Sequence, residues 1–160
     1  MLHDRCVAFA RTNPKEGLER AKVWKDQGGG FYADHCIAMA LFLLHDYAEA
    51  AQRFEALATA MLGVPVAQRA QALDQAGQSW LAAREPERAK AAFDAAIQLN
   101  GDDADLLIDR SEAFADLRRY WDAIDDLNRA VELAPTRAEA YIYRGTAYRY
   151  VDARDLALED

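Results

Sequence analysis

A pattern of small and aromatic residues recurs every 34 residues in the second half of the chain. The segments 70–82, 104–116 and 138–150 align, with a small residue at one position and an aromatic residue three positions later. The aligned positions are Gly77, Ser111 and Gly145, followed by Trp80, Phe114 and Tyr148. Self-similarity at this period indicates a solenoid built from repeated units.

The same pattern occurs once more upstream, around residues 38–57. The step from this unit to the next one is 39 residues instead of 34. The five extra residues fit a longer loop around the sequence GVPVAQR. Within each unit the apolar residues recur at spacings of three and four, which places them on one face of a helix. Val and Ile are sparse and do not alternate with polar residues, so we expect no sheet. The predicted fold class is all-α, with two antiparallel helices in each unit.

Several helix boundaries can be read from local sequence. Asn13 and Pro14 are suited to begin a helix, and the three glycines at 28–30 are suited to end it. Thr136 and Glu139 have the spacing of a capping box, which predicts another helix start there.

These residues resemble the tetratricopeptide repeat (TPR) family. The best match is ADLLIDRSEAFADLRRYWDAIDDLNRAVELAP, residues 104–135, which is complete to its closing Pro135. The resemblance implies a right-handed α-solenoid, with a TPR array over 31–160 and an N-terminal helical pair, a degenerate repeat or cap, over 1–30. The expected repeats are 31–69, 70–103, 104–137 and a shortened 138–160.

The shortened last repeat leaves one face of its first helix uncovered. Solenoids normally close with a polar capping helix. We therefore expect that the natural chain continues, or that a partner or a second copy covers this end by self-association.

The net charge is −8, and the excess of acidic residues lies after residue 69. This acidic half would repel phosphate backbones, so we expect no nucleic-acid partner. The alternative is that these charges only keep an alanine-rich helical protein soluble. No apolar run reaches the roughly 18 residues that cross a membrane, so we expect no membrane insertion.

Reactive side chains are few. His3, His35 and His45 lack the spacing of a metal site, and motifs for a nucleophile or a phosphate cradle are missing. We expect no metal, no cofactor and no catalysis by this chain.

Cys6 and Cys36 lie in the first helices of neighbouring units, which run side by side in a solenoid. They form either a disulfide or two small buried apolar contacts. A disulfide implies an oxidising compartment. Residues 35–58 are also similar to exported bacterial TPR proteins, so we expect a periplasmic or otherwise exported protein, with the cytoplasm as the alternative.

The resemblance implies that first helices line a concave groove in which peptides or partner helices dock. The groove positions on this chain are Tyr32, His35, Met39, Phe42, Asp74, Gln78, Asp105, Ile108, Glu112, Glu139, Ile142 and Arg149. Alternatively, the apolar N-terminal part of this face is covered by residues 1–30. Some family members grip a peptide's terminal carboxylate with basic groove residues. Asp74 and Glu112 at such positions would repel a carboxylate, so the groove suits hydrophobic and basic side chains better.

We therefore expect a non-catalytic protein-protein interaction scaffold. The alternatives are a self-assembling structural module and a regulatory fragment of a larger enzyme.

Overall fold

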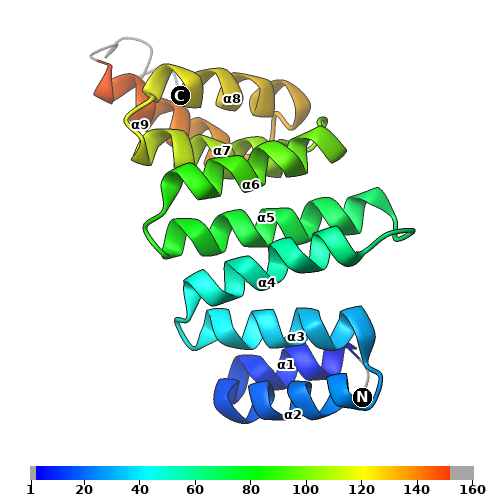
Figure 1. Cartoon of the computed structure of the whole chain (residues 1–160). Helices are drawn as coiled ribbons and strands as arrows, with labels where there is room; N and C mark the ends of the chain where they lie inside the picture. Colours follow the sequence, from blue (N-terminus) through cyan, green and yellow to red (C-terminus); the bar gives the residue numbers. More distant parts are fainter. Residues whose placement is uncertain (1–2, 152–160) are drawn as a thin grey trace.

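The structure is a computed structural model that describes residues 3–151 of the 160-residue chain. Across this range the regular elements are all helices, and they stack in chain order from α1 and α2 at one end to α8 and α9 at the other (Figure 1). The helices are α1 (His3–Thr12), α2 (Pro14–Asp26), α3 (Gly30–Leu43), α4 (Tyr47–Ala60), α5 (Val66–Ala82), α6 (Pro86–Leu99), α7 (Ala104–Asp116), α8 (Tyr120–Leu133) and α9 (Ala138–Tyr150). The predicted all-α solenoid is confirmed. The second helix of the last repeat lies outside the described residues.

The same turn joins the two helices of three successive repeats. Its central residues, His45, Arg84 and Arg118, have positive φ angles of 68°, 64° and 59°. In each case the amide of the following residue donates to a carbonyl five residues earlier, as Arg119 does to Phe114 at 2.8 Å. This is the Schellman geometry, for which glycine is the favoured central residue. The sequence predicts where this turn lies, but its central residues are not glycine, so their positive φ angles strain the backbone.

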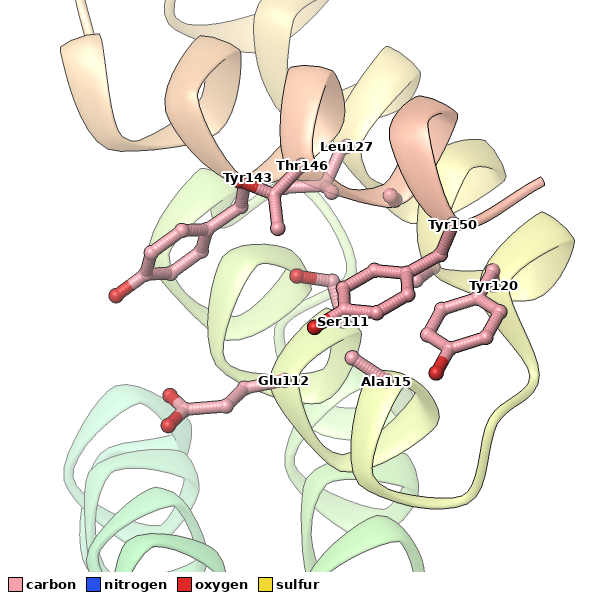
Figure 2. Close-up of a pocket in the computed structure, with 10 residues that line it drawn as sticks. Ser111, Glu112, Ala115, Tyr120, Leu127, Tyr143, Thr146 and Tyr150 are labelled. Atoms are coloured by element: carbon pink, nitrogen blue, oxygen red, sulfur yellow. The ribbon is translucent and has the colours of Figure 1, made fainter. Parts of the chain in front are cut away.

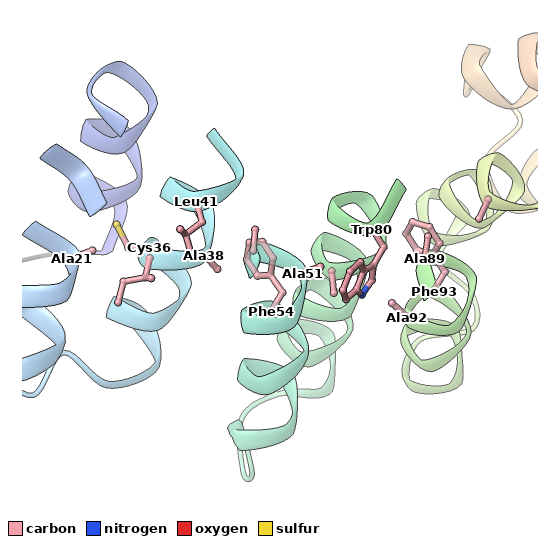
Figure 3. Packing of buried hydrophobic residues seen from close by; sticks show 14 of the residues in the cluster. Ala21, Cys36, Ala38, Leu41, Ala51, Phe54, Trp80, Ala89, Ala92 and Phe93 are labelled. Carbon is pink, nitrogen blue, oxygen red and sulfur yellow. The ribbon is translucent and has the colours of Figure 1, made fainter. Parts of the chain in front are cut away.

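In the repeat formed by α5 and α6, the two helices meet at the small residue of the pattern. A Cβ atom added to Gly77 on α5 would lie 2.5 Å from the ring of Phe93 on α6. Phe93 has no exposed surface, and Trp80 beside it is only 2% exposed. Both belong to a core that runs through α1 to α7, part of which Figure 3 shows. Trp80 also donates its indole N–H to Glu55 of α4 at 2.8 Å.

An ion-pair bridge joins α6, α7 and α8. Arg110 on α7 donates to both carboxylate oxygens of Asp126 on α8, at 2.6 and 2.8 Å. It also donates to Asp94 on α6 at 2.8 Å. Asp126 is buried, and this bidentate geometry is the strong form of a charge-assisted hydrogen bond. The bridge therefore fixes one repeat against the next.

The N-terminal pair packs closely onto the array. Within the pair, α1 and α2 approach each other closely at Gly17 of α2, because a Cβ atom there would lie 2.7 Å from the Cα atom of Ala10 on α1. Cys6 on α1 and Cys36 on α3 form a disulfide, with Cα atoms 6.1 Å apart. The disulfide alternative for the two cysteines is thus the one seen in the structure, and it ties the first helices of the two units together.

Two local predictions need correction. The insertion before the second repeat is mostly helical, because α5 has 17 residues whereas α7 and α9 have 13 each. Its residues Ala67, Gln68 and Arg69 are good helix formers and add one turn to α5. The predicted capping box is wrong as well. Arg137 precedes the first residue of α9, without a side-chain cap, and Thr136 lies in the preceding turn.

No helix in the described range is both long and apolar enough to span a bilayer. The proposed division into 1–30 and 31–160 stays a prediction.

Candidate functional site

Three pockets follow the first helices of the array, and we call them the N-terminal, central and C-terminal pockets. The N-terminal pocket has a volume of about 460 Å³ and lies between α3, α4 and the beginning of α5. Tyr32 and Phe31 from α3 line it together with Leu57 from α4 and Met61, which follows the end of α4. The added turn of α5 contributes Gln68, so the insertion builds one wall of this pocket.

Two histidines border the same pocket. His3 Nε2 lies 2.9 Å from His35 Nδ1, and His35 Nε2 lies 2.9 Å from the amide oxygen of Gln75 on α5. Burial lowers the pKa of His35, and the nearby His3 acts in the same direction. The two rings and Gln75 therefore form a hydrogen-bonded chain that joins α1, α3 and α5.

The central pocket, of about 330 Å³, is acidic. Asp74 and Gln78 from α5 line it with Asp105 and Asp109 from α7. Gln78 donates to Asp74 at 2.9 Å and to Asp109 at 3.0 Å, so one amide holds two carboxyl groups close together. Arg137 also lines this pocket and pairs with Asp105.

Burial and the proximity of Asp109 raise the pKa of Asp74 to about 8. Asp74 therefore favours its protonated form at neutral pH. Its Oδ1 atom is buried and has no partner in the part of the chain that the structure describes. Burial likewise raises the pKa of Asp109. The two carboxyl groups therefore resist carrying two negative charges side by side.

The C-terminal pocket, of about 150 Å³, lies between α7, α8 and α9. Figure 2 shows Tyr143 on one side of it and the Tyr150 and Tyr120 rings on the other, with Glu112 below the space between them. Tyr143 also lines the central pocket, so the two pockets adjoin.

The predicted groove residues divide into three groups. Those that line a pocket are Tyr32, His35, Asp74, Gln78, Asp105, Ile108, Glu112 and Glu139. Met39 and Phe42 are half-buried against the core, and Phe42 also packs on the Tyr47 ring at 5.2 Å. Ile142 and Arg149 are exposed on α9 but line none of the three pockets. Ile108 is only 5% exposed and belongs mainly to the core.

The sequence assignment missed one position on each of α5, α7 and α9. Gln75, Asp109 and Tyr143 are related by the 34-residue step and line the pockets. The assignment followed residues at spacings of three and four along one narrow line. The face that lines the pockets also includes the neighbouring position on each of these helices. Comparing residues 34 positions apart would have revealed these three residues.

The N-terminal helices cover part of the face, since His3 of α1 packs on Tyr32, with ring centroids 5.4 Å apart. The pocket beside them stays open. His45 contacts Tyr47 in its turn, away from the other two histidines. Between residues 3 and 151 there is no group of three or more His, Cys, Asp or Glu residues placed to hold a metal ion.

Comparison with known proteins gives structural likeness only. No protein-family model matches the sequence, and no curated protein does so. The solved structure of MamA 41-end from Desulfovibrio magneticus RS-1 has a TM-score of 0.82 at 20% identity, covering 98% of this chain and 85% of that chain. YrrB, described as a TPR protein with an unusual peptide-binding site, has a TM-score of 0.72 at 19% identity, covering 96% and 80%.

A third structure is the second TPR of Spaghetti (RPAP3) bound to the HSP90 peptide SRMEEVD. It has a TM-score of 0.56 at 25% identity and covers 58% of this chain and 86% of that chain. The chain therefore has the tetratricopeptide repeat fold, as its repeat pattern predicts.

Proposed function

We propose that this chain is a non-catalytic interaction scaffold that binds an extended peptide or a partner helix along the first helices of its repeats. The observation that carries this proposal is the arrangement of the three pockets. Gln75 and Gln71 of α5 line the N-terminal pocket, and Asp74 and Gln78 of the same helix line the central one. Tyr143 then links the central pocket to the C-terminal one. A single extended segment can contact all three.

The chemistry of the face favours binding over catalysis. The serine and threonine hydroxyl groups that line these pockets, those of Ser111 and Thr146, donate to backbone carbonyls of their own helices. Neither is therefore a nucleophile activated by a neighbouring base in the part of the chain that the structure describes. The peptide-binding sites of YrrB and of the RPAP3 repeat support the same reading for a chain with this fold. The proposed disulfide-bonded state also supports an exported protein in an oxidising compartment.

Peptide selection from a random display library tests the proposal. Selected peptides would be measured against the purified chain and two double variants. Gln71→Arg/Thr146→Arg changes exposed residues of the N-terminal and C-terminal pockets. Val23→Arg/Trp121→Arg adds the same charge at exposed positions outside all three pockets.

We expect the first double variant to weaken binding at least about tenfold and the second to leave it within about twofold. The opposite order, or failure to select any binder, would refute the proposal. The self-association alternative predicts a mass that rises with concentration in sedimentation equilibrium, and a constant monomer mass would exclude it.

A further inference from the structure

We propose that the C-terminal pocket binds a basic side chain, a lysine or arginine carried by the partner segment. This inference rests on the proposed function, because it names the chemistry recognised at one end of that same face. It is argued from how the pocket arises, from the groups that line it, and from the charges around it.

The pocket exists because one core residue is smaller in its repeat than in the preceding one. Phe93 fills the space beside Gly77, whereas the equivalent pair in the next repeat is Leu127 and Ser111. Both Leu127 and Ser111 line the C-terminal pocket. The leucine is too short to reach where the phenylalanine ring would lie, and the result is a space of about 150 Å³, comparable to one long side chain.

The walls of the pocket are aromatic. Tyr150 is stacked on Tyr120, with ring centroids 4.7 Å apart and an interplanar angle of 5°. This stacking holds the Tyr150 ring in place, and Tyr143 stands on the other side of the pocket (Figure 2). Tyrosine ring faces attract a cation, while Leu127 and Ala147 provide apolar contact for the carbon chain that carries it.

The surrounding charge is negative and unpaired. Glu112 reaches the pocket, and its pKa is raised first by burial and then by Asp109 and Asp116. Glu112 and Glu139, together with burial and Asp109, raise the pKa of the Tyr143 phenol as well. Within residues 3–151, none of Glu112, Asp109 and Glu139 forms an ion pair.

These features select among occupants. A carboxylate or phosphate would meet the like charge of Glu112, and a purely aliphatic side chain would leave that carboxylate desolvated without a partner. A guanidinium or ammonium group satisfies it with a charge-assisted hydrogen bond and lies against the tyrosine rings. A basic side chain is the occupant that uses all the groups of the pocket.

The test is a titration of the ¹⁵N-labelled chain, followed by NMR, with three peptides that differ at one position. The probes are acetyl-Ala-Ala-Arg-Ala-Ala-amide and the versions with norleucine or glutamate in place of arginine. We expect saturable shifts of the Glu112, Tyr143 and Tyr150 amides with the arginine peptide. The norleucine peptide should bind about tenfold more weakly, and the glutamate peptide should cause no shift there.

Three variants complete the test. Glu112→Gln should weaken the arginine peptide about tenfold, whereas Asp125→Asn, the same loss of one charge at an exposed site on α8, should not. The double variant Leu127→Phe/Ser111→Gly, which reproduces the pair of Phe93 and Gly77, should fill the pocket and abolish the shifts, with the circular dichroism spectrum checking that it folds. If the variant that fills the pocket does not fold, Glu112→Gln alone still tests the inference.

Equal binding of the arginine and norleucine peptides, or an unchanged affinity of Glu112→Gln, would overturn the inference. So would arginine-dependent shifts confined to the central pocket. In each case peptides selected by display could still bind the face, so the proposed function would stand. Failure of the display selection would remove both.

Discussion

The contact between Gly77 and Phe93 allows a quantitative test of how the repeats pack. A methyl group at residue 77 would lie 2.5–2.7 Å from three ring atoms of a side chain with no exposed surface. Overpacking of this kind costs about 1–3 kcal/mol. Replacing glycine by alanine inside a helix returns about 1 kcal/mol through helix propensity. Gly77→Ala should therefore lower the free energy of unfolding by about 1 kcal/mol.

The sign should reverse when the ring is removed. In a Phe93→Leu background, which imitates the Leu127 site of the next repeat, Gly77→Ala meets no ring and should stabilise by about 1 kcal/mol. The double-mutant cycle thus has an expected coupling of about 2 kcal/mol, within the range of contacting residues. Urea denaturation followed by circular dichroism measures all four proteins. If Gly77→Ala stabilises both backgrounds equally, the close crossing of α5 and α6 is not what selects glycine.

Three further predictions concern stability. Reducing the Cys6–Cys36 disulfide, whose cysteines are 30 residues apart, should lower the free energy of unfolding by about 3–4 kcal/mol; urea denaturation with and without reductant measures this, and an unchanged midpoint would contradict it. Arg118→Gly should raise the free energy of unfolding by about 1 kcal/mol, because glycine adopts the positive φ of this turn without strain; a thermal scan showing a lower Tm would refute the strain argument. Since the folded pKa of Asp74 is raised to about 8, its contribution to stability is complete below pH 4 and is lost as the pH rises towards and through 8. Denaturation between pH 4 and 9 should accordingly show a smaller loss at high pH for Asp74→Asn than for the natural chain, with the exposed Asp125→Asn as control; parallel curves would argue against the buried proton.

The sequence predicts those parts of the fold that repeat. Crossing positions such as Gly77 recur in register, and the turn at His45 and Arg118 is marked by its place between two helices. The sequence also predicts that the two cysteines lie on neighbouring first helices, but it leaves open whether they form a disulfide or two buried apolar contacts. The insertion before α5 could not be placed in this way, since it has no counterpart in the following repeats to set its register.

The candidate site was less predictable because it depends on departures from the repeat. Asp74 and Asp109 are not equivalent positions in their repeats, and only the packing of α5 on α7 brings them together under Gln78. The C-terminal pocket depends on the missing ring atoms at Leu127. A pattern that scores both Phe and Leu as apolar does not register such a difference.

The leucine at residue 127 also suggests how an array of this kind changes what it recognises. Leu127 forms the floor of the C-terminal pocket and is also a core residue. The depth of the pocket is therefore set by a residue that belongs to the interior of the protein. Phe93 occupies the corresponding position one repeat earlier, and shortening it would open a second recess beside Gly77. Because neighbouring repeats share one architecture, selectivity could move along the solenoid through single exchanges in its interior, while the outer surface and the stacking of helices stay the same.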